Sequence, residues 1–78
     1  MNYNIATILV RKPKIAAEKL QNLFTLYGCI IRSRLGLNRD NIEGGLIILE
    51  LSGDEKQIVL FTEELNRLEG IDYKYIKL

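Results

Sequence analysis

The sequence predicts a small α+β sandwich in which two helices cover one face of a four-stranded antiparallel sheet. Two observations support this fold class. The 78 residues divide into two similar halves, each in the order strand, helix, strand. In each half, short apolar runs typical of strands flank a segment whose apolar residues recur every three to four positions. A chain of this length is sufficient for one domain, so residues 1–78 are predicted to form a single unit.

The first half starts with a strand and a helix. Tyr3–Arg11 is rich in apolar and β-branched residues, as expected for a central strand. Pro13, the only proline, suits the first turn of a helix because its missing N–H costs nothing there. Gly28 is placed to end that helix. The residues expected on the buried helical face are Ala16, Leu20, Leu23, Phe24 and Tyr27.

The remaining elements follow the same reasoning. Cys29–Leu37 alternates as a strand, with Ile31, Ser33 and Leu35 on one side and Arg32 and Arg34 on the other. Asn38–Gly45 is predicted to be a turn, Leu46–Ser52 a third strand and Ile71–Leu78 a fourth. Ser52, Gly53 or Asp54 can cap the second helix, Glu55 favours its first turn and Gly70 ends it. Its predicted apolar stripe is Ile58, Phe61, Leu65 and Leu68.

This order of elements predicts the split βαβ, or ferredoxin-like, topology. Each helix joins two strands by a right-handed crossover, and the middle two strands form a hairpin. The first and third strands are then central, which agrees with their strongly apolar composition.

The open face of such a sheet is the strongest candidate for a functional surface. Alternation directs Ala6, Ile8, Val10, Ile47, Leu49 and Leu51 toward the helices. The apolar band on the other face, expected to be flanked by Arg32, Arg34 and Lys74, marks an interface, either of a homodimer or tetramer that buries the open face or of a homodimer that joins edge strands. The alternative is a tolerated amphipathic surface. The predicted interface residues are Ile5, Thr7, Leu9, Arg32, Arg34, Leu46, Ile48 and Glu50.

Composition excludes several function classes. The net charge of +1 is too small for a dedicated nucleic-acid binder, and no segment is long and apolar enough to span a membrane. The chain has no histidine and one cysteine, so we expect no metal site, no cofactor and no catalytic residues of the usual kinds. The N-terminus has no secretory leader, which predicts a cytoplasmic protein.

The charges are unevenly divided along the chain. Residues 1–39 carry a net charge of +6, and residues 40–78 carry −5. Such a chain could associate half to half, or dock a larger protein partner; the alternative is chance placement on solvated faces.

One loop is a candidate ligand site. Arg11, Lys12, Pro13 and Lys14 surround a helix start, a place that favours a carboxylate or phosphate. The alternative is a solvated basic cap, because the loop has no glycine to let a ligand approach the backbone. Cys29 is expected to be a small buried residue, and Arg32 and Arg34 are expected beside Glu50. The fold also serves RNA-binding modules and acylphosphatases, but the aromatic residues of the former and the second-strand Asn of the latter are missing.

Three stretches carry a resemblance to known families. Residues 7–31, TILVRKPKIAAEKLQNLFTLYGCII, resemble the opening of an ACT domain. The whole chain is similar to the small stand-alone iron-only hydrogenase system regulators, which are related to the ligand-binding half of nickel-responsive regulators. Arg34-Leu35-Gly36-Leu37 matches an Arg-Met-Gly-Ile-like run of that family, and Leu68-Glu69-Gly70-Ile71 matches its Leu-x-Gly-Val.

The resemblance implies a non-enzymatic regulatory module that oligomerises through its sheets and binds a small ligand between subunits. Nickel binding does not carry over, because the histidines are absent. Amino-acid-binding ACT domains often carry Asp-x-Pro-Gly where this chain has Arg11 to Lys14, so an anionic ligand suits this loop better. The alternatives are a ligand-independent protein–protein interaction module and, third, a small acylphosphatase-like enzyme.

Overall fold

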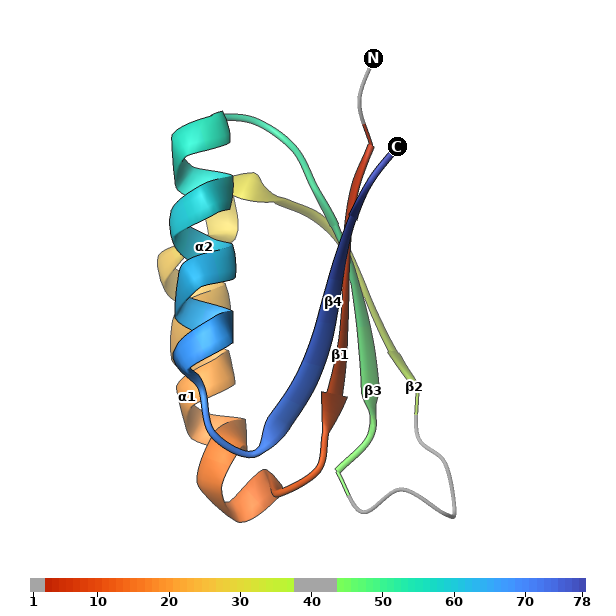
Figure 1. Cartoon of the computed structure of the whole chain (residues 1–78), viewed down its shortest axis with the longest axis vertical. Helices are drawn as coiled ribbons and strands as arrows, with labels where there is room; N and C mark the ends of the chain where they lie inside the picture. Colours follow the sequence, from red (N-terminus) through yellow and green to blue (C-terminus); the bar gives the residue numbers. More distant parts are fainter. Residues whose placement is uncertain (1–2, 38–43) are drawn as a thin grey trace.

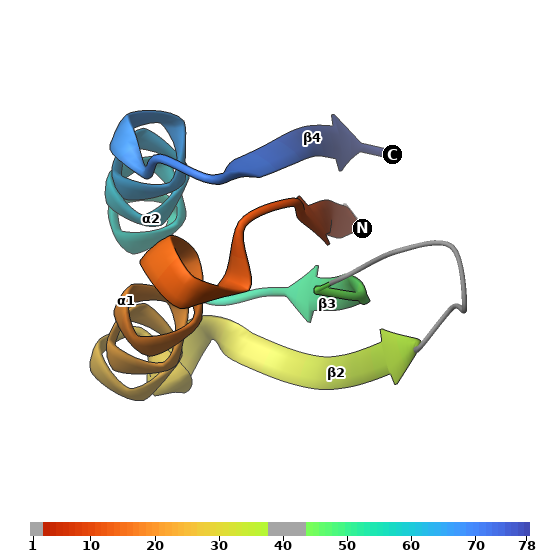
Figure 2. The ribbon, with the colours of Figure 1, turned by 90° about the horizontal axis from the view of Figure 1, so that it is seen from below.

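The computed structural model describes residues 3–37 and 44–78, and these form the predicted ferredoxin-like sandwich. The strands lie in the order β2-β3-β1-β4, and all neighbours are antiparallel. Both helices cover one face, with α2 on the β4 side and α1 on the β2 side (Figures 1 and 2). The elements are β1 (Asn4–Val10), α1 (Pro13–Leu26), a 3-10 turn η1 (Gly28–Ile30), β2 (Ile31–Leu37), β3 (Leu46–Leu51), α2 (Glu55–Arg67) and β4 (Ile71–Lys77).

The core lies between the sheet and the helices, where the periodicity predicted it. Every second residue of β1 is buried, and the predicted stripe of α1 is buried throughout. Phe61 of α2 is fully buried, with its ring centroid 5.3 Å from that of Tyr27 and 6.3 Å from that of Phe24. Asn4 is the one buried polar residue among those described, and it accepts a hydrogen bond from the Tyr75 hydroxyl. No helix in the described part of the chain is long and apolar enough to cross a membrane.

The ends of the helices follow from local chemistry. Pro13 begins α1 as predicted, and the Lys12 carbonyl accepts from the amides of Ile15 and Ala16. Gly28 does not end α1 through a left-handed conformation; the helix ends at Leu26, and Gly28 starts η1. Of the three capping candidates for α2, the structure selects Asp54, whose Oδ1 accepts from the amide of Lys56 at 2.8 Å.

This cap gives a first prediction. Asp54→Ala removes the acceptor for one otherwise unpaired amide and the negative charge at the helix start, so we expect a loss of about 1 kcal/mol in the free energy of unfolding. Equilibrium unfolding in urea measures it, with Asp54→Asn as the control that keeps the capping oxygen. A midpoint for Asp54→Ala equal to that of the wild type would contradict the assigned cap.

Strand β2 is where the structure departs from the predicted alternation. A β-bulge lies between Ile31 and Ser33, because Ile31 pairs with Leu51 while Ser33 pairs with the adjacent Glu50. Ile31 therefore packs against the core, while Ser33 and Leu35 lie on the open face. The three residues were predicted to share one side of the strand. Cys29 was also predicted wrongly: it lies in η1 and is exposed rather than buried.

Candidate functional site

The open sheet face is the largest candidate surface, and the strand register arranges it in three rows. The middle row is Leu35, Ile48, Thr7 and Lys74, read from β2 to β4. One neighbouring row is Ser33, Glu50, Ile5 and Ile76, and the other is Leu37, Leu46, Leu9 and Asp72. Seven of these twelve positions carry aliphatic side chains, so the predicted apolar band is present and extends onto both edge strands.

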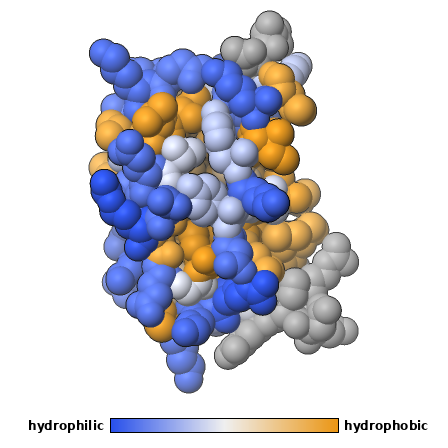
Figure 3. Space-filling view, in the orientation of Figure 1, coloured by the Kyte–Doolittle hydropathy of each residue, from blue (hydrophilic) through white to orange (hydrophobic). Residues whose placement is uncertain are grey.

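The central part of this face is half-buried by its neighbours, and its margins are exposed. Leu35 on β2 is 54% exposed and Ile76 on β4 is 47% exposed. Figure 3 shows hydrophobic side chains along the side of the molecule opposite the helices. The Glu50 carboxylate accepts a hydrogen bond from the Ser33 hydroxyl at 2.9 Å. A contiguous apolar surface of this kind on a small domain is typical of an interaction site.

Arg34 does not lie on the face where it was predicted, and neither arginine of β2 is paired with Glu50 as predicted. Arg34 is on the helix-covered side, with its guanidinium carbon 4.8 Å from the ring centroid of Phe24 and a 3.4 Å hydrogen bond to the Gln21 side chain. Arg32 lies at the bulge and donates from Nε to the Ser52 hydroxyl at 2.6 Å. Neither contacts Glu50, whose partner is Ser33. The bulge explains the position of Arg34, because it turns Ser33 and Leu35, rather than Arg34, toward the open face.

The predicted anion loop is already tied to the start of β4. The amides of Arg11 and Lys12 both donate to the Gly70 carbonyl at 2.9 Å, and the Arg11 side chain forms an ion pair with Asp72. Gly70 has φ +90°, and a Cβ there would lie 3.1 Å from that of Lys12. These two amides and one of the four predicted side chains therefore have partners within the chain. Fewer hydrogen-bond donors and charges remain in the loop to bind a ligand.

Pro13 nevertheless borders a hollow of about 240 Å³ between the start of α1 and the ends of β2 and β3. Arg34 and Gln21 supply its polar side chains, while Arg11, Lys12 and Lys14 are not among its lining residues. Gly44 allows the close approach of the chain here, since a Cβ at this position would lie 2.3 Å from the Val10 carbonyl oxygen. Sequence reasoning missed Arg34 as the cation of this site, because it placed that side chain on the other face.

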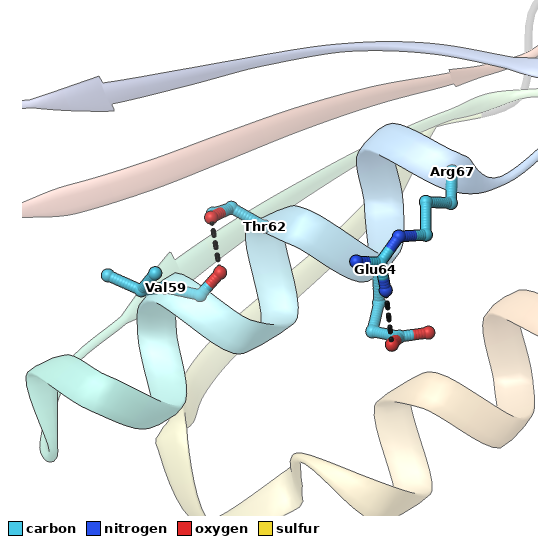
Figure 4. A network of polar contacts seen from close by, with 4 residues as sticks. All are labelled: Val59, Thr62, Glu64 and Arg67. Atoms are coloured by element: carbon cyan, nitrogen blue, oxygen red, sulfur yellow. Dashed lines mark hydrogen bonds and ion pairs between the residues drawn. The ribbon is translucent and has the colours of Figure 1, made fainter.

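A second hollow, of about 450 Å³, lies between the two helices. Its charged residues include Glu64 and Arg67, which pair with each other at 3.3 Å (Figure 4). The same figure shows the Thr62 hydroxyl donating to the Val59 carbonyl of the preceding turn, at 2.8 Å. The pair is exposed and joins neighbouring turns of one helix, so it is a local surface contact. Within residues 3–37 and 44–78, no three metal-ligating side chains gather at one place.

Comparisons with known proteins identify the fold. No protein-family model and no curated protein matches the sequence. Among solved structures, the chain is similar to the uncharacterized protein TM1266 from Thermotoga maritima, with a TM-score of 0.83 and 19% identity over 99% of this chain and 95% of that one. It is also similar to part of a formyltetrahydrofolate deformylase from Pseudomonas putida KT2440, with a TM-score of 0.55 and 7% identity over 97% of this chain and 28% of that one. At such low identity, the likeness shows the fold alone, a small ferredoxin-like sandwich.

Proposed function

We propose that this chain is a non-enzymatic regulatory module of the ACT-like kind, which works as a homo-oligomer joined through its open sheet face. The observation that carries the proposal is the apolar face, built from all four strands with aliphatic side chains at seven of twelve positions. Four strands and three rows of side chains span roughly 20 by 20 Å. That footprint, about 400 Å², is roughly half of the area that each partner contributes to a standard stable interface, so the proposed oligomer also buries surface around these twelve positions.

Sedimentation of the wild-type chain tests the oligomer. We expect a dimer or larger species at micromolar concentration, because a small domain gains much of its stability by covering such a face. A chain that stays monomeric throughout the micromolar range would contradict this part of the proposal.

The regulatory part of the proposal concerns a small anion at the hollow beside Pro13. Support comes from the position of Arg34, which lines the hollow, and from Leu37 and Leu46, which border both the hollow and the open face. A ligand held there would lie near the rim of the subunit interface, so binding and association would be coupled. We also propose that the protein works in the cytoplasm and regulates an iron-only hydrogenase system. The support for this is the sequence resemblance, including the run Arg34–Leu37.

A thermal-shift titration with citrate and with phosphate distinguishes the binding residues. We expect the melting temperature of the wild type to rise with anion concentration, and Arg34→Met to abolish that rise. Arg11→Met is the matched control, because Arg11 is paired with Asp72 and does not line the hollow. Loss of the response in Arg11→Met, with retention in Arg34→Met, would return the site to the loop predicted from sequence.

A ligand-independent interaction module is the second candidate, favoured by the way Gly70 and Asp72 engage the predicted anion loop. It predicts that neither anion changes the melting temperature, while association remains. A small acylphosphatase-like enzyme is the third candidate, and an assay of acyl-phosphate hydrolysis decides it.

A further inference from the structure

The open face contains a hollow of about 520 Å³ over β1 and β4, and polar as well as apolar side chains line it. Leu9 and Ile76 form apolar walls, and Thr7 and Lys74 lie side by side as register partners between them. Tyr73 also borders the hollow, but its hydroxyl donates to the Thr62 carbonyl of α2, so its ring lies on the helix side. The volume is within the usual range for small-molecule sites.

Lys74 gives the hollow a positive charge that has no ion-pair partner among the described residues. The acid among its described lining residues is Asp72, which is paired with Arg11. Lys74 takes part in no ion pair or hydrogen bond with any side chain of the described residues, and the Thr7 hydroxyl likewise has no partner among them. An ammonium group and a hydroxyl between aliphatic walls fit a carboxylate that carries an apolar chain.

We infer that this hollow binds a small apolar carboxylic acid, with the carboxylate at Lys74 and Thr7 and the hydrocarbon chain against Leu9 and Ile76. The inference rests on the proposed function in one respect: a second copy packed on the open face covers the hollow and shields the ligand from water. A charged pair in a less polar environment is stronger than one at the surface, so the ligand would strengthen association.

The opposite arrangement is a dimer in which a carboxylate of the second copy, rather than one of a ligand, neutralises Lys74 on the open face. The two arrangements make opposite predictions, because a carboxylic acid would then compete with the second copy and weaken the dimer.

Isothermal titration of the full chain with octanoate tests the site. We expect saturable binding that weakens about tenfold or more in Lys74→Met, which keeps the aliphatic stem and removes the charge. Lys77→Met is the control, since Lys77 pairs with Glu55 on the helix side of the same strand and should leave the affinity unchanged. Two probes make the test independent of any variant: octanol lacks the charge and butyrate lacks most of the chain, so both should bind more weakly to the wild type.

Sedimentation with and without octanoate keeps the outcomes apart. Binding together with a stronger dimer supports the inference. No binding of octanoate, equal binding of octanol, or dissociation of the dimer by octanoate would overturn it, even if the dimer itself exists. A monomeric wild type that still binds octanoate through Lys74 supports the site and contradicts the proposed oligomer instead.

Discussion

Ile48→Lys is expected to convert the proposed oligomer into a folded monomer. Ile48 is at the centre of the open face, between Leu35 and Thr7 in the middle row, and is half-buried in the single chain. In the monomer a lysine there can extend its ammonium group into water. In a dimer the same group would be buried without a partner at the middle of an apolar interface, which costs several kcal/mol. We therefore expect the dissociation constant of the dimer to increase by roughly a hundredfold or more.

Sedimentation equilibrium measures this change, and circular dichroism shows whether the fold is retained. Leu60→Lys is the matched control, because Leu60 is a 45% exposed leucine on α2, away from the open face. It should leave both association and fold unchanged. Equal association of Ile48→Lys and the wild type would exclude this face as the interface, and equal loss in both variants would point to a general effect of added charge.

The second large effect is expected in the core. Phe61→Ala removes a fully buried ring that packs against Tyr27 and Phe24, so we expect a loss of about 3–5 kcal/mol in the free energy of unfolding. A domain of this size has only about 5–10 kcal/mol in total, so the variant would be barely stable. Urea unfolding monitored by circular dichroism measures this loss, at a fixed protein concentration because the proposed association would also stabilise the fold.

Two variants bracket that result. Phe61→Leu keeps most of the apolar volume and should lose less than half as much. Val59→Ala, two residues away on the same helix but 52% exposed, should be close to the wild type. A change below about 1 kcal/mol for Phe61→Ala would mean that the interior rearranges to fill the space.

The fold could be predicted because its periodicities are strong and agree with one another. The buried stripe of α1 and the alternating residues of β1 and β3 fall where the sequence placed them. Within each of these elements, the side of the chain that faces the core follows from spacing alone. The central position of β1 and β3 also followed, since strands flanked on both sides are the most apolar.

The candidate site was harder to predict because it depends on irregularities and on distant partners. A bulge adds one residue to β2 and leaves no mark in composition, so the sides of Ser33 and Arg34 were exchanged. The ion pair of Arg11 joins residues 61 positions apart in the sequence, and so no local pattern indicates it. The hollow beside Arg34 and the one beside Lys74 are products of packing, which residue spacing does not describe.

The order of strands has a consequence for the way the chain folds. The two halves of the sequence look like repeats, but β1 of the first half lies between β3 and β4 of the second, and neither half contains two neighbouring strands. Either half alone would have one α-helix and two strands that do not pair with each other. The pairing of Asn4 with Lys77 brings together the two ends of the described chain, which requires closing a long loop at an entropic cost. We therefore expect a single cooperative folding event that is slower than the formation of either helix.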